Sequence, residues 1–139
     1  MATILVCTHR EDVLAELGPL LRSKHQVAIV PHVADVVRSM LLTRLDAVVL
    51  DIDEELMDHV DILPIIARLN PRIPILTVSN PTSLEVEAAL RAAGIFSFLL
   101  SPLAPGELEH HLAAALPWRA AEAAAPSRPN DANAAATAR

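Results

Sequence analysis

Polar side chains that could take part in chemistry follow four of the short apolar runs in this 139-residue chain. They are Thr8, His9 and Arg10 after the first run, Asp51 and Asp53 after the third, Ser79 and Asn80 after the fourth, and Ser101 after the last. A carboxylate such as Asp51 can accept a phosphoryl group when Mg²⁺ neutralises the incoming oxygens, and Mg²⁺ prefers carboxylate ligands. These residue types indicate phosphoryl-transfer or cation-binding chemistry, provided that the fold brings the groups together.

The elements that must position these groups are five short apolar runs alternating with five stretches of helical periodicity. The expected strands are residues 3–7, 27–30, 47–52, 73–78 and 95–100, and the expected helices are residues 11–24, 33–45, 56–69, 83–93 and 105–116. This alternation predicts an α/β fold of the flavodoxin-like type, a three-layer (βα)5 sandwich around a parallel five-stranded sheet of order 2-1-3-4-5. Strands one, three, four and five are then neighbours, so their polar carboxyl ends converge.

The bulk composition restricts the class of partner. The chain has a formal net charge of −6, and only 2% of its residues are aromatic. Nucleic-acid binding needs a basic face, so we expect no nucleic-acid partner. Cys7 is the one cysteine, and a single thiol within an apolar run predicts a reduced, buried side chain. The sequence shows no signal peptide and no membrane-spanning run, which favours the cytoplasm and no membrane partner.

The composition changes near the end of the chain. Residues 117–139 are mostly Ala, Pro and small polar residues, with Trp118 as almost the only side chain to bury. A segment of this kind predicts disorder. We therefore expect one domain at residues 1–116, followed by an Ala/Pro-rich disordered tail at residues 117–139.

Three segments carry a recognisable pattern: AVVLD ending at Asp51, IPILTVS ending at Ser79, and AAGIFSFLLSPL, which contains Phe98 and Pro102. On these segments, residues 2–116 resemble the receiver domains of two-component response regulators. The resemblance implies a role in bacterial phosphorelay signal transduction, with Asp51 at the phosphoacceptor position. It also implies that Ser79 and Phe98 occupy the switch positions. The peptide bond before Pro102 is then expected to be cis.

The chain departs from this family at three positions of the site. Thr8 and His9 stand where the family has a pair of acidic residues, and Ser101 stands where it has a lysine. Each carboxylate lost at about 4 Å removes up to about 4 kcal/mol of attraction for a cation at an intermediate effective dielectric. The sequence therefore predicts a degenerate site that binds Mg²⁺ poorly, with no metal or cofactor, in an atypical or pseudo-receiver.

Three functions remain open on the sequence alone. The leading interpretation is a stand-alone atypical receiver that signals by protein–protein contacts without Mg²⁺-dependent phosphorylation. The alternatives are a working response regulator phosphorylated on Asp51, and a small-ligand-binding or enzymatic flavodoxin-like domain. We do not expect an enzyme, because the glycines form no phosphate-binding loop and there is no nucleophile elbow. The expected partners are a histidine kinase, a signalling scaffold, or a second copy bound through the face of the fourth helix, fifth strand and fifth helix.

Overall fold

The computed structural model describes residues 2–58, 60–80 and 84–124. The strands are β1 (Thr3–Cys7), β2 (Gln26–Val30), β3 (Ala47–Ile52), β4 (Ile75–Ser79) and β5 (Ser97–Leu100). The helices are α1 (Glu11–Arg22), α2 (Val33–Leu42), α3 (Glu54–Asp58), the 3-10 turn η1 (Val60–Ile62), α4 (Leu63–Leu69), α5 (Leu84–Ala92) and α6 (Glu107–Ala124). No helix in these ranges is long and apolar enough to cross a membrane.

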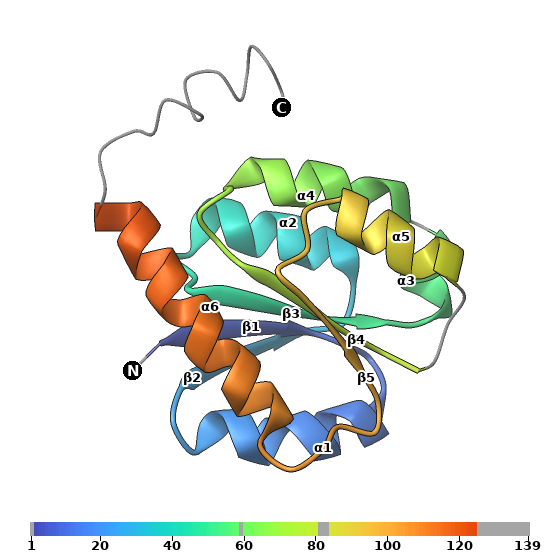
Figure 1. Cartoon of the computed structure of the whole chain (residues 1–139), viewed down its shortest axis with the longest axis horizontal. Helices are drawn as coiled ribbons and strands as arrows, with labels where there is room; N and C mark the ends of the chain where they lie inside the picture. Colours follow the sequence, from blue (N-terminus) through green and yellow to red (C-terminus); the bar gives the residue numbers. More distant parts are fainter. Residues whose placement is uncertain (1, 59, 81–83, 125–139) are drawn as a thin grey trace.

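The strands form one parallel sheet of order β2-β1-β3-β4-β5, which confirms the predicted topology. Helices α1 and α6 cover one face, and α2, α3, α4 and α5 cover the other (Figure 1). The chain therefore has the three layers expected of a flavodoxin-like sandwich. All carboxyl ends of the strands lie at one edge of the sheet, because every pairing is parallel.

Alternation along the strands divides the apolar residues between two cores. In β1, Ile4 and Val6 pack with α1 and α6, whereas Leu5 and Cys7 pack with the helices of the other face. All six residues of β3 are buried, including its polar residue Asp51. A strand covered on both faces must be apolar almost throughout, so a carboxylate within it needs partners of its own.

The expected third helix, residues 56–69, is divided into α3, η1 and α4. Pro64 lies in the first turn of α4, where its missing N–H costs nothing and its ring disfavours continuation from the preceding turn. The fourth and fifth helices expected from the sequence are therefore α5 and α6. Residues 56–69 have one continuous apolar stripe in the sequence, so the periodicity did not reveal this break.

The last helix is longer than predicted and contains Pro117. It begins at Glu107, after Gly106 at a φ of 78°, and continues to Ala124 rather than ending at residue 116. Alanine has the highest intrinsic helix propensity, so the first residues of the Ala-rich segment extend the helix. The rest of the expected tail, residues 125–139, lies outside the described residues.

Candidate functional site

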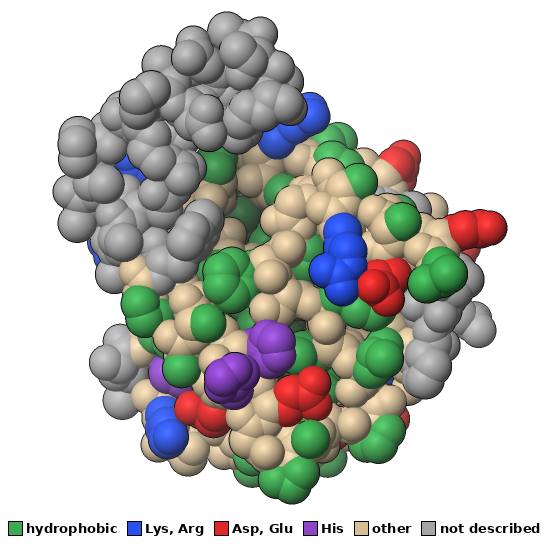
Figure 2. Space-filling view, viewed as in Figure 1, with side chains coloured by type: hydrophobic (Ala, Val, Ile, Leu, Met, Phe, Trp, Pro, Cys, Tyr) green, Lys and Arg blue, Asp and Glu red, His purple; other side chains and the backbone are tan. Residues whose placement is uncertain are grey.

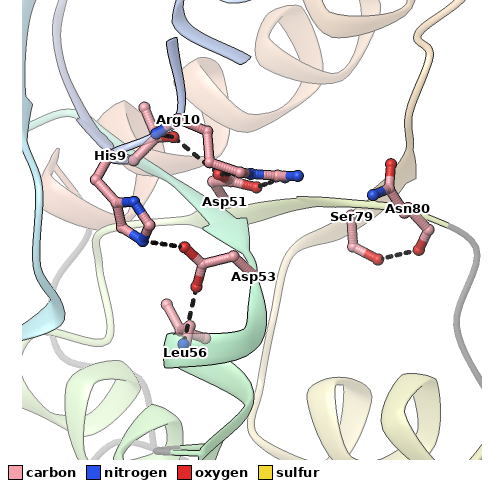
Figure 3. A network of polar contacts seen from close by, with 8 residues as sticks. His9, Arg10, Asp51, Asp53, Leu56, Ser79 and Asn80 are labelled. Atoms are coloured by element: carbon pink, nitrogen blue, oxygen red, sulfur yellow. Dashed lines mark hydrogen bonds and ion pairs between the residues drawn. The ribbon is translucent and has the colours of Figure 1, made fainter. Parts of the chain in front are cut away.

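Asp51 is the centre of a polar cluster at the carboxyl edge of the sheet. It is the fifth residue of β3, and its side chain is 0% exposed. The Arg10 guanidinium binds both carboxylate oxygens, with Nε 2.8 Å from Oδ2 and Nη2 in contact with Oδ1. The Thr8 hydroxyl donates a third hydrogen bond to Oδ2 at 2.8 Å. The buried carboxylate thus has its charge matched and both oxygens occupied (Figure 3).

The loop between β1 and α1 places Arg10 over Asp51. The Arg10 N–H donates to the Thr8 hydroxyl at 3.1 Å, and the Arg10 carbonyl accepts from the Leu14 N–H as α1 begins. The side-chain hydrogen bond with Asp51 is the largest cause that raises the pKa of Arg10, and it outweighs the opposing effect of partial burial. The negative charges of Asp51, Asp12 and Asp53 also raise the pKa of Arg10. Arg10 is therefore held as a cation against Asp51.

His9 points away from Asp51 and pairs with Asp53 instead. Its Nε2 lies 2.6 Å from Asp53 Oδ2, and the other oxygen of Asp53 accepts the Leu56 N–H at 2.9 Å. That second bond caps the amino end of α3, which is a common use of aspartate. His9 and Asp53 thus form a contact between the β1–α1 loop and α3, next to the Asp51 cluster (Figure 3).

The two switch positions lie on the neighbouring strands. Ser79 ends β4, is fully buried, and donates from its hydroxyl to the Asn80 carbonyl. The Ser101 N–H donates to the Ser79 carbonyl at 2.7 Å, and the Ser101–Pro102 peptide bond is cis. Phe98 is partly buried against the core that includes α5. Ser79 lies apart from Asp51 in Figure 3, so the sheet brings these residues to one edge without bonding them to each other.

The structure joins two of the sequence-predicted site residues, Thr8 and Asp51, and bonds both to Arg10, which the sequence analysis named after the first strand but gave no role. Arg10 stands in the loop at the end of β1, which pairs directly with β3, and this position next to the strand of Asp51 was the available signal. Among the described residues, no group of three His, Cys, Asp or Glu side chains is placed to hold a metal ion. The arrangement can fix and neutralise a buried carboxylate.

Comparison with known proteins agrees with this architecture, although no family model matches the chain. The sequence is 31% identical over 125 residues to the transcriptional regulatory protein PrrA of Mycobacterium leprae and to that of Mycobacterium tuberculosis. The match covers 89% of this chain and 54% of each relative, so the chain spans about half the length of these curated relatives.

Solved receiver domains superpose on nearly the whole domain. The CheY-like receiver domain protein of Methanospirillum hungatei gives a TM-score of 0.76 at 19% identity, covering 88% of this chain and 98% of that one. This chain has the receiver fold of response regulators. The signal receiver domain of an HD domain-containing protein of Pseudomonas fluorescens gives a TM-score of 0.78 at 20% identity. That superposition covers 86% of this chain and 98% of the Pseudomonas domain.

Proposed function

We propose that this chain is an atypical receiver domain in which Arg10 takes the place of a metal ion at Asp51. In this proposal the domain is a cytoplasmic signalling module that acts through protein contacts and not as an enzyme. The bidentate contact of Arg10 with Asp51 carries the proposal. A receiver that is phosphorylated needs its aspartate free to attack a phosphoryl group and a cation beside it to bind the incoming oxygens. Here the aspartate is already bound by a cation that belongs to the chain.

The donor set around Asp51 does not suit Mg²⁺. This ion takes oxygen ligands in near-octahedral geometry and favours carboxylates. The neighbouring side chains are the Thr8 hydroxyl, which is neutral, and the Arg10 guanidinium, which is positive. A divalent ion would have to displace Arg10 and leave that guanidinium beside a second positive charge. We therefore propose that the domain needs no metal or other cofactor.

If phosphorylation does not drive the switch, the contact face of the domain keeps one conformation. The elements of that face, α5, β5 and α6, include the exposed apolar residues Leu84 on α5 and Leu100 on β5, and the exposed Phe96 directly precedes β5. Arg91 and Glu87 form an ion pair on α5 at 3.0 Å. Figure 2 shows this side of the molecule, with hydrophobic side chains spread among polar ones. We propose that it binds a histidine kinase, a scaffold or a second copy constitutively, with contacts that include Glu87, Arg91, Glu107 and His110.

A second candidate is a working response regulator. Two observations favour it: the curated relatives of Mycobacterium are named transcriptional regulatory proteins, and Asp51 and Ser79 lie at the ends of adjacent strands β3 and β4. In this case a kinase or the phosphoryl donor itself would displace Arg10 from Asp51 during the reaction.

Incubation with acetyl phosphate and Mg²⁺, followed by intact-mass measurement, separates the two candidates. We expect no phosphorylated protein from the natural sequence. Addition of one phosphoryl group that Asp51→Asn abolishes would establish the working regulator and refute our proposal.

A matched pair of variants tests the role assigned to Arg10. The triple variant Thr8→Asp, His9→Asp, Ser101→Lys supplies the acidic pair and the lysine, yet Arg10 remains in place. We expect Mg²⁺ to bind only when Arg10→Ala is added to these three changes, as detected by saturable NMR shifts near Asp51. If the triple variant binds Mg²⁺ as well as the quadruple variant does, Arg10 does not block the site.

A further inference from the structure

A second surface, on the outer side of α2 and α4 and away from the sheet, has exposed aliphatic side chains. Leu41 and Leu42 at the end of α2, and Ile65 and Leu69 on α4, are between 38% and 78% exposed. A single exposed leucine is ordinary, whereas a group of large aliphatic side chains on adjacent elements marks a binding surface. The contact face proposed above does not include either of these helices.

Helical spacing explains why these residues are together and why the core cannot bury them. In α2, Val36 and Met40 are buried against the sheet, and in α4, Leu63 and Ile66 are buried in the same way. Leu41 continues the stripe of the half-buried Val37 on the flank of α2. Helices α2 and α4 pack side by side with their carboxyl ends at the same edge of the sheet (Figure 1). The four aliphatic side chains therefore lie on one outer surface.

Arginines surround this apolar group. Arg38 lies on α2 and Arg68 on α4, Arg44 follows α2, Arg72 follows α4, and all four are exposed. None of the four forms an ion pair with another described residue. Two carboxylates lie close in sequence to these arginines: Asp46, just after Arg44, accepts the Thr3 N–H at 2.8 Å, and Asp35 lies one turn before Arg38 on α2. On a chain with a net charge of −6, this is a local concentration of positive charge.

We infer that this α2–α4 surface, made of these four aliphatic and four arginine residues, binds an acidic amphipathic helix from a partner protein. Leucine-type side chains of the helix would cover the apolar group, and its carboxylates would pair with the surrounding arginines. Charge complementarity selects this occupant. A second copy of the same acidic domain, or an anionic lipid surface, would also meet the negative charge on the rest of the domain. A single helix would contact only the α2–α4 surface.

Two synthetic peptides of four helical turns, about 14 residues each, test this inference. One has Leu at i, i+3, i+4 and i+7 on one face and Glu on the other, and the matched peptide has Lys in place of every Glu. We expect the Glu peptide to shift the amide NMR signals of α2 and α4 saturably, and the Lys peptide to leave them unchanged. Arg38→Glu and Arg68→Glu should each weaken binding roughly tenfold. Arg22→Glu, an exposed reversal on α1 across the sheet, is the matched control and should not weaken it.

Several results would overturn the inference. These are equal binding of the two peptides, shifts confined to other elements, the absence of saturable binding, or equal effects of Arg68→Glu and Arg22→Glu. Flotation with phosphatidylserine-containing vesicles tests binding to an anionic lipid surface, and sedimentation velocity tests binding to a second copy of the domain. Vesicle binding or dimer formation that Arg68→Glu abolishes would assign the surface to lipid or to a second copy, and the peptide proposal would then be wrong. Since none of these measurements involves Asp51, their outcome is separate from that of the phosphorylation test.

Discussion

Substitution of Arg10 by methionine tests the ion pair at the centre of the site. It removes both guanidinium donors from Asp51, whose side chain is 0% exposed, and leaves only the Thr8 hydroxyl. Removing one partner of a fully buried ion pair costs about 3–5 kcal/mol. Arg10 is 26% exposed, so water can enter part of the space and lower that cost. We expect the free energy of unfolding to fall by about 2–3 kcal/mol.

The controls use the other partner. Asp51→Asn leaves the unpaired charge on the partly exposed Arg10, so we expect a smaller loss of about 1 kcal/mol. The double variant Arg10→Met, Asp51→Asn buries no unpaired charge, and its loss should be below the sum of the single losses by roughly 1–2 kcal/mol. Urea unfolding followed by circular dichroism measures all four proteins. An Arg10→Met loss below about 0.5 kcal/mol, or simple additivity, would refute this reasoning.

The pH dependence of the same comparison has a definite sign. The hydrogen bond and charge of Asp51 raise the pKa of Arg10. A base with a raised folded-state pKa contributes stability at every pH below its unfolded value, and that stability is lost only as the pH rises through the folded value. An arginine side chain loses its proton only in strong alkali. The stability difference between the natural protein and Arg10→Met should therefore persist from roughly pH 6 to roughly pH 9, and its disappearance towards pH 9 would show that another group is responsible.

Three further predictions concern the rest of the domain. If the α5–β5–α6 face self-associates constitutively, Asp51→Asn should change the dissociation constant in sedimentation equilibrium by less than about twofold, whereas Arg91→Glu should weaken it by about tenfold; the reverse order would indicate a live site. Deleting residues 125–139 should move the melting temperature by no more than about 1 °C, because that segment offers few apolar side chains to bury, and a larger fall would show that it packs on the domain. His9→Ala should cost less than about 0.5 kcal/mol because the His9 side chain is 44% exposed, whereas Asp53→Ala should cost about 1 kcal/mol through loss of the α3 cap; equal costs in thermal unfolding would contradict this assignment.

The sequence determined the architecture because the information for it is local. Each strand is a short, nearly continuous apolar run, which is the pattern expected of a strand that is buried on both faces of a sheet. The alternation of these runs with amphipathic helices then fixes a parallel sheet, and a parallel sheet collects its strand ends at one edge. That reasoning placed Asp51, Thr8 and Ser79 at the edge where the structure has them. The sequence did not reveal the break before α4 or the end of α6. A proline lies in each of these helices, and whether it interrupts a helix depends on the packing of that helix in the folded domain.

Only the tertiary structure decided what Asp51 is bound to. Arg10 and Asp51 are 41 residues apart in the chain, and β1–β3 pairing brings them together. The Arg10 side chain has several rotatable bonds, and no local pattern favours the conformation that reaches a carboxylate on another strand. Burial makes that conformation favourable, because the Asp51 charge has no water to solvate it and the nearest cation is Arg10. The same limit applied to Leu41, Leu42, Ile65 and Leu69, whose shared surface exists only because α2 and α4 pack side by side.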